Sequence, residues 1–93
     1  MTKPYVGDTG TIIQLDTGAS LTGATSLSIE AKRPDGTVVS WAATAVDGTK
    51  VQFVTLANSL NMAGDWKLQA RVVLPSGTWT GEVAPLRVYR LFD

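Results

Sequence analysis

The chain contains neither cysteine nor histidine. The absence of cysteine excludes disulfide bonds, thiolate zinc sites and cysteine nucleophiles, so the fold must be held by packing rather than by covalent crosslinks. The absence of histidine removes the usual general base, the commonest metal ligand and the side chain that titrates near neutral pH. A conventional serine–histidine–aspartate triad is therefore excluded as well.

An excess of charge of either sign is also missing. Eight lysines and arginines balance eight aspartates and glutamates, which gives a formal net charge of zero. The nearest approach to a basic stripe consists of four separated residues: Lys67, Arg71, Arg87 and Arg90. Cations spread in this way are typical of a solvated face, whereas nucleic-acid-binding domains concentrate theirs. Because no run of like charges occurs either, we expect neither a nucleic-acid partner nor a membrane partner.

Long hydrophobic segments are lacking too. No stretch approaches the roughly 20 consecutive apolar residues of a transmembrane helix, and residues 1–5 do not resemble the start of a signal peptide. We therefore expect a protein that is made in the cytoplasm, with neither a signal peptide nor a transmembrane segment. With 93 residues, of which 44% are hydrophobic, the chain has the size and composition of one small globular domain spanning 1–93.

Turn-forming residues punctuate the sequence at short and fairly even intervals. Glycine permits a positive φ and proline presets a turn. The turn signals lie at 7–10, 16–18, 34–36, 47–48, 63–65 and 75–77. The segments between them are short and rich in valine, isoleucine, threonine and aromatic residues. Such segments between regular turns predict an all-β sandwich or barrel.

Alternation of apolar and polar residues strengthens this prediction, because it places one face of each strand inward and one toward solvent. The longest alternating run begins at Trp66 and ends at Leu74. The predicted strands are 11–15, 26–32, 37–43, 50–56, 65–74, 78–83 and 86–91. The last two can also form one long strand bent at Pro85, since proline is confined to edges and bulges of sheets.

Only segment 57–64 departs from the β pattern. We expect at most one short helical turn near 57–63, with Ser59 as its N-terminal cap and Gly64 at its end. Leu60 would then point into the core.

Two antiparallel sheets that face each other bury the apolar faces of all these strands. We therefore expect an immunoglobulin-like β-sandwich of about seven antiparallel strands, held by packing of Trp41 and Trp66 at its centre. Trp79 follows the turn at 75–77 and is expected to be partly exposed. An exposed tryptophan indicates either an interface residue or cross-strand packing, and the sequence leaves both open.

One motif has a counterpart among enzymes. Asp16-Thr17-Gly18 resembles the active-site signature of aspartic proteases, whose retroviral members are homodimers in which each subunit supplies one aspartate. Against this, Gln14 is polar where that family has an apolar or small residue, and a second Asp-Thr-Gly occurs at 8–10. The later apolar pair followed by glycine is missing from 86–92, as is a glycine-rich flap. The motif therefore predicts turn chemistry, and the homodimeric protease is kept as an alternative.

The remaining acidic residues do not form a ligand set. Five aspartates lie in predicted turns, at Asp8, Asp16, Asp35, Asp47 and Asp65. They are too far apart in sequence for the spacing of a calcium loop, and an aspartate in a turn commonly bonds to its own backbone. We therefore expect no catalytic residue, no metal site and no cofactor.

Several pieces of the chain occur in a recognisable order. They are Val6-Gly7-Asp8 with 11–13, then 21–25 leading into 27–29, then 32–37, and finally 63–70. In this order they resemble the N-terminal domain of phage baseplate upper proteins and related small tail proteins. The resemblance implies a non-enzymatic virion component of the tail or baseplate that contacts other virion proteins or further copies of itself. The match covers that domain alone, without the receptor-binding or fibre-forming extension of a complete baseplate protein.

The C-terminal part of the sequence supplies the candidate interface. The predicted edge at 78–91 and the apolar segment after it contain four exposed candidates: Trp79, Tyr89, Leu91 and Phe92. An unpaired strand edge with apolar side chains is a physical means of binding a neighbouring subunit. The alternative is a module that binds carbohydrate or a cell surface, in which Trp79 or Tyr5 would stack on a sugar ring.

Overall fold

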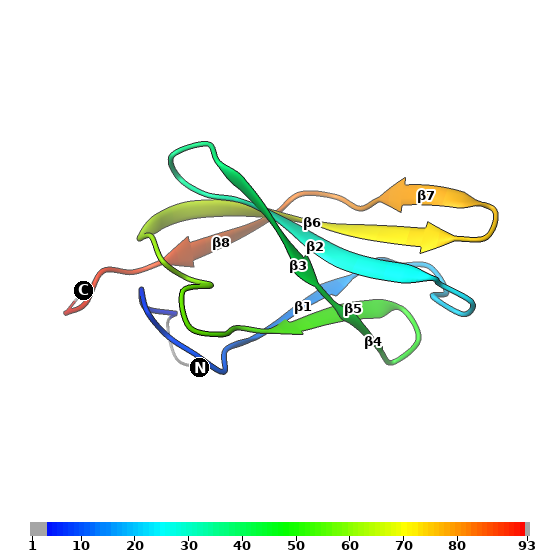
Figure 1. The fold of residues 1–93 in the computed structure, drawn as a ribbon, viewed down its shortest axis with the longest axis horizontal. Helices are drawn as coiled ribbons and strands as arrows, with labels where there is room; N and C mark the ends of the chain where they lie inside the picture. The colour runs from blue at the N-terminus through cyan, green and yellow to red at the C-terminus, as the bar shows by residue number, and fades with distance from the viewer. Residues whose placement is uncertain (1–3, 93) are drawn as a thin grey trace.

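The computed structural model describes residues 4–92. Residues 1–3, at the start of the chain where we expect no signal peptide, lie outside the described residues. Within 4–92 the chain forms strands and turns and no helix (Figure 1). The strands are β1 (Ile12–Asp16), β2 (Ser26–Lys32), β3 (Val38–Ala42), β4 (Thr44–Val46), β5 (Lys50–Val54), β6 (Gly64–Leu74), β7 (Gly77–Thr80) and β8 (Ala84–Val88). The prediction of an all-β chain is confirmed.

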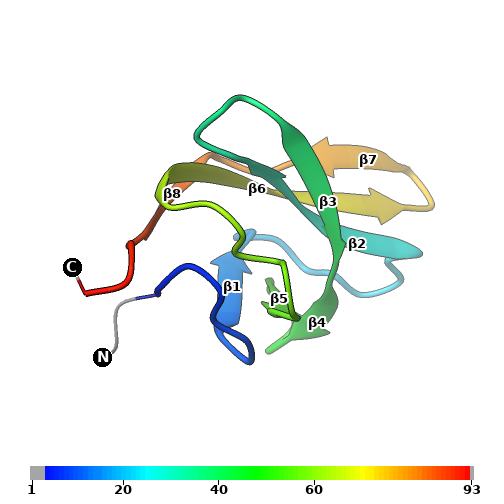
Figure 2. The same ribbon diagram turned by 60° about the vertical axis from the view of Figure 1, so that its left-hand side comes forward.

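The strands form two antiparallel sheets that face each other (Figure 2). The three-stranded sheet has the order β1-β5-β4, and the five-stranded sheet contains β3-β2-β6. Two strands pair with the edge of β6 that faces away from β2. Strand β7 pairs with the C-terminal half of β6, and β8 pairs with the N-terminal half of β6. The arrangement is sandwich-like, as the alternating pattern predicted.

The predicted strand 37–43 corresponds to β3 (Val38–Ala42), and the chain continues directly into β4, a strand of the other sheet that was not predicted. Ala43 still donates its N–H to the carbonyl oxygen of Leu27, at 3.0 Å, in the five-stranded sheet. The next residue, Thr44, is paired with Gln52 in the three-stranded sheet. Residues 4–92 therefore contain eight strands rather than about seven. Alternation cannot reveal this change of sheet, because it reports the face of a residue and not the neighbour of its strand.

No helix forms near 57–63, where at most one short helical turn was expected, and the segment contains a turn, a bend and irregular residues. Ser59 Oγ accepts the N–H of Leu56 at 2.9 Å, and the N–H of Ser59 donates to the Leu56 carbonyl at 3.1 Å. Ser59 therefore closes a turn and does not cap a helix. Leu60 is fully buried, as predicted.

The edge formed by β7 and β8 is interrupted at 81–83 and not at Pro85. Arg71 faces Thr80, and Leu68 faces Ala84. The two residues between Leu68 and Arg71 therefore face the three residues between Thr80 and Ala84. One extra residue on one strand is a β-bulge, which bends the edge. Pro85 lies inside β8, where an edge position tolerates its missing N–H.

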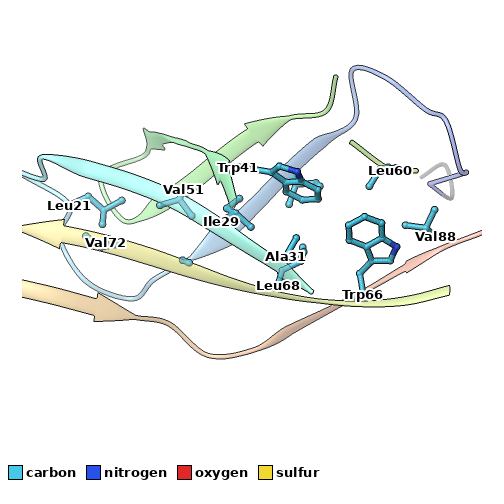
Figure 3. Packing of buried hydrophobic residues seen from close by; sticks show 12 residues of the cluster. Leu21, Ile29, Ala31, Trp41, Val51, Leu60, Trp66, Leu68, Val72 and Val88 are labelled. Atoms are coloured by element: carbon cyan, nitrogen blue, oxygen red, sulfur yellow. The ribbon is translucent and has the colours of Figure 1, made fainter. Parts of the chain in front are cut away.

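A row of aromatic rings joins the two sheets within the core, and Figure 3 shows two of them, Trp41 and Trp66. The Trp41 ring stacks on Phe53 of the three-stranded sheet at a centroid distance of 4.9 Å and on Trp66 at 5.8 Å. Trp66 is fully buried, and its Nε1 donates to the Met62 carbonyl at 2.9 Å. A buried indole N–H needs such a partner. The central role predicted for Trp41 and Trp66 is confirmed.

The turn between β2 and β3 packs closely against the start of β6. Thr37 donates its N–H and its hydroxyl to Asp35 Oδ1, and these bonds, led by the hydroxyl, hold the pKa of Asp35 below its ordinary value. Pro34 of the same turn lies against Gly64, where a Cβ atom would come within 2.7 Å of Pro34 Cγ. Gly64 also has a φ of +131°, which side chains rarely adopt.

We expect Gly64→Ala to lower the free energy of unfolding by about 3 kcal/mol or more, because a strained backbone and overpacking each cost about 1–3 kcal/mol. Gly10→Ala is the matched control, since Gly10 has a φ of +77° with nothing within 4 Å of an added Cβ. It should cost only the backbone part, about 1–2 kcal/mol. Urea unfolding measures both. Equal losses would contradict the close packing of Pro34 on Gly64.

Candidate functional site

The two sheets are joined on one side and open on the other. On the joined side, β3 of the five-stranded sheet continues through Ala43 into β4 of the three-stranded sheet. On the other side, the edges are β1 and the bulged edge β7–β8, and no described strand pairs with either edge from outside (Figure 2). This open side contains the candidate site.

The backbone of β7 points hydrogen-bonding groups out of the sheet. Gly81 donates its N–H to the Ala70 carbonyl at 2.8 Å, which makes this a hydrogen-bonded pair. Bonded and non-bonded pairs alternate along an antiparallel ladder. Thr78 and Thr80, which face Val73 and Arg71, therefore direct their N–H and C=O groups away from β6. Such groups are a template for an added strand.

The edge of β1 presents the same kind of groups on the opposite sheet. Thr55 donates to the Thr11 carbonyl and Thr17 to the Thr49 carbonyl, each at 2.9 Å. Both bonds continue the register of β1 and β5, so the odd-numbered residues of β1 are the bonded ones. The even-numbered residues, Ile12, Gln14 and Asp16, therefore direct their backbone groups toward the free edge.

A cleft of about 740 Å³ lies between β1 and the bulge. Residues 14–18 form one wall, residues 80–84 form the other, and Ala70 of β6 lies between them. Two acidic residues, Asp16 and Glu82, line the cleft, and no lysine or arginine does. Both acidic residues are exposed to solvent. The cleft therefore carries negative charge at the open side of a chain whose formal net charge is zero.

A second, more apolar hollow of about 360 Å³ continues this cleft, and the two share Thr17, Thr80 and Gly81. Its apolar walls are Leu21, Val72, Leu74 and Trp79, which together we call the Trp79 slot. Trp79 faces Val72 across the ladder, and directly paired residues share a face of the sheet. Because Val72 is in the core, the Trp79 ring also points to the inner face.

Trp79 is nevertheless 51% exposed, as expected from its place beside a turn. Its ring lies against Gly77, where an added Cβ would come within 3.1 Å of the Trp79 Cη2 atom. Residues two positions apart in a strand share a face, so Trp79 shares its face with Gly77 and Gly81. Because glycine has no side chain, both neighbours leave room beside the ring. A half-exposed tryptophan on the inner face of a sheet is a favourable binding point for a partner protein.

The four residues predicted as an interface do not lie together. Trp79 is in β7 at one end of the long axis, whereas 89–92 follow β8 at the other end (Figure 1). Tyr89 is half-buried against Tyr5, at a ring-centroid distance of 6.1 Å, and its N–H donates to the Pro4 carbonyl. Leu91 is 60% exposed and Phe92 is fully exposed.

Sequence reasoning missed several residues of the open side: Leu21, Gly77, Gly81 and Glu82. The sequence did contain one signal of the exposed slot: glycines lie two positions before and two positions after Trp79. A large residue flanked by glycines on the same face of a strand is left uncovered by its neighbours. Glu82 gave no such signal, since its place beside Asp16 depends on how the two sheets are stacked.

Asp16-Thr17-Gly18 forms a turn, as the sequence predicted, because Asp16 Oδ1 accepts the N–H of Gly18 at 2.9 Å. At the other Asp-Thr-Gly motif the turn lies before the motif, over residues 5–8, where Asp8 Oδ2 accepts the N–H of Tyr5 at 2.9 Å. Thr17 donates its hydroxyl to the Thr49 carbonyl at 2.6 Å. Within 4–92 no three acidic side chains come together as a metal-binding group. None of the described segments is a helix with the length and apolar character needed to cross a membrane.

No protein-family model, no curated protein and no solved structure matches the chain. The resemblance to phage baseplate and tail proteins stays a prediction that rests on the residues quoted for it.

Proposed function

We propose that the chain is a non-enzymatic structural module that works by protein–protein contact, as a component of a phage tail or baseplate. The observation that carries this proposal is the open side of the sandwich, where two strand edges flank the half-exposed Trp79. Edge strands bind other chains by hydrogen bonding of their main chains, and tryptophan is enriched at interface centres.

The form of the β7–β8 edge favours selective contact over open-ended aggregation. Its outward groups at Thr78 and Thr80 belong to a strand of only four residues. The bulge at 81–83 then bends the edge, and Pro85 offers no N–H to a partner. Short strands, bulges and proline are the usual protection of a free edge. A partner therefore needs side-chain contacts as well, for which Trp79 and the 55% exposed Val83 are placed.

The chemistry of the described residues supports a role without catalysis. The chain has no cysteine or histidine, and the carboxylate of Asp16 bonds to the backbone of its own turn. A surface that binds a neighbouring subunit needs none of these reactive groups, whereas it does need exposed apolar side chains beside unpaired backbone.

Assignment to a phage particle, and to the immunoglobulin-like sandwiches in particular, is part of the proposal. It is supported by where the resembling pieces fall in the fold. The piece 32–37 forms the turn between β2 and β3, and 63–70 forms the start of β6 with the buried Trp66. These two pieces contact each other through Pro34 and Gly64. An immunoglobulin-like sandwich places tryptophan in a comparable central position.

Thr80→Pro should weaken binding to partner proteins at least about tenfold, because it removes an outward N–H and leaves the bonds to β6 intact. The control is Ser40→Pro on β3, at the joined side. The backbone bonds of Thr37 and Ala43 to the neighbouring chain segment show that odd-numbered residues of β3 are the bonded ones, so the N–H of Ser40 points outward. Binding is measured by sedimentation and by co-purification with tail proteins encoded beside the gene. A chain that binds neither those proteins nor itself would contradict the proposal.

A second candidate function is binding of carbohydrate, which the same tryptophan favours. Trp79 lies beside a cleft lined by the acidic residues Asp16 and Glu82. A sugar ring can stack on an exposed indole while its hydroxyls donate to carboxylates. This arrangement offers both kinds of contact within connected hollows.

If the site binds carbohydrate, a glycan array should show a ligand whose binding is lost with Trp79→Ala. Val38→Ala is the matched control, since Val38 is 64% exposed on β3, away from the cleft. Circular dichroism checks that both variants fold. Binding that survives Trp79→Ala, or no binding to any glycan, would rule out this candidate.

A further inference from the structure

Two adjacent exposed apolar residues, one of them the most exposed large apolar residue described, lie at the end of the molecule opposite the Trp79 slot. Phe92 is fully exposed and Leu91 is 60% exposed, and both follow the short segment that Tyr89 holds against Pro4 and Tyr5. We call Leu91 and Phe92 the C-terminal knob. Two adjacent large apolar side chains held beyond a fixed point are suited to insertion into a partner.

The Trp79 slot is an apolar hollow and so has the chemistry to receive apolar side chains. Its walls are Leu21, Val72, Leu74 and Trp79, around a volume of about 360 Å³. Leu21 and Val72 belong to the buried core, at the end away from Trp66 and Val88 (Figure 3). A side chain that entered the slot would therefore extend the core of the sandwich.

Two arginines precede the knob, and acidic residues lie beside the slot. The cleft that continues the slot is lined by Asp16 and Glu82. The segment before the knob carries Arg87, whose side chain is 60% exposed in its ion pair with Asp65, and the exposed Arg90. Complementary charges at the rim of an apolar contact favour encounter and fix orientation.

We propose that the occupant of the Trp79 slot is the C-terminal knob of a second copy of this chain. The slot and the knob lie at opposite ends of a molecule that is 45 Å long. The contact is therefore head-to-tail: each copy offers a slot to one neighbour and a knob to another. Repetition of such a contact produces a ring or an open filament. This inference rests on the proposed function and names one partner of its open side.

A head-to-tail contact is tested by mixing two defective variants. Phe92→Asp removes the knob, and Trp79→Asp damages the slot. Each variant alone should associate at least about tenfold more weakly than the unchanged chain. Their mixture retains one intact slot and one intact knob, so it should form dimers and nothing larger. The unchanged chain should grow beyond a dimer with concentration, and light scattering coupled to size exclusion measures each mass.

Two further variants guard against misfolding, and one serves as the control. Leu91→Asp changes the knob, and Ala19→Arg changes an exposed residue that lines the same hollow as the four residues of the slot, so the two variants repeat the mixing experiment at other positions. Val38→Asp places the same charge on an exposed valine away from both features and should assemble like the unchanged chain. Circular dichroism verifies the fold of every variant.

An unchanged chain that stays monomeric at high concentration would overturn the inference. So would a mixture that remains monomeric, because a symmetric contact or other surfaces would then be involved. If the chain is monomeric but a tail protein binds it in a manner sensitive to Thr80→Pro, the slot takes a different protein and the proposed function stands. If neither the chain itself nor a tail protein binds, both proposals fail.

Discussion

On one side of the sandwich β3 passes directly into β4, whereas on the other side β1 and β7–β8 are edges that do not pair with each other, and the other features of the molecule follow from this. Where β3 passes through Ala43 into β4, covalent continuity fixes the distance between the sheets and closes the core. On the opposite side, hydrogen bonds of Tyr89 with Pro4 and Val6 join the segment after β8 to the segment before β1, while the edges β1 and β7 do not pair with each other. The stack of Phe53, Trp41 and Trp66 spans the two layers inside the core. The open side is left with unpaired backbone and an incompletely covered Trp79.

An open side of this kind is useful only if it does not bind indiscriminately. The bulge at 81–83 and Pro85 limit the length over which another strand can pair with β7–β8. In the proposed function, selectivity comes from side chains: the apolar Trp79 slot and the acidic residues Asp16 and Glu82 beside it. A small domain with few reactive side chains can in this way act through surfaces, which agrees with a role in assembly.

Much of the fold was predictable because apolar and polar residues alternate along its strands. The run from Trp66 to Leu74 was assigned to one long strand, and β6 covers all of it. The change of sheet at Ala43 was not predictable, since it leaves the alternation intact. Nor was the inward direction of Trp79, because the face of an edge residue depends on its cross-strand partner, here Val72. The separation of Trp79 from Phe92 depends on the topology of the whole chain.

Residue-resolved hydrogen exchange, recorded by NMR at low and high protein concentration or with a bound partner, tests the central claim most directly. The claim is that contacts form on the open side. The amides of Thr78, Thr80 and Gln14 should exchange rapidly in the dilute chain and become protected on assembly. The amide of Ser40, which points outward from β3 on the joined side, should exchange equally fast in both states. Protection of Ser40 with unchanged exchange at Thr78 and Thr80 would contradict the account.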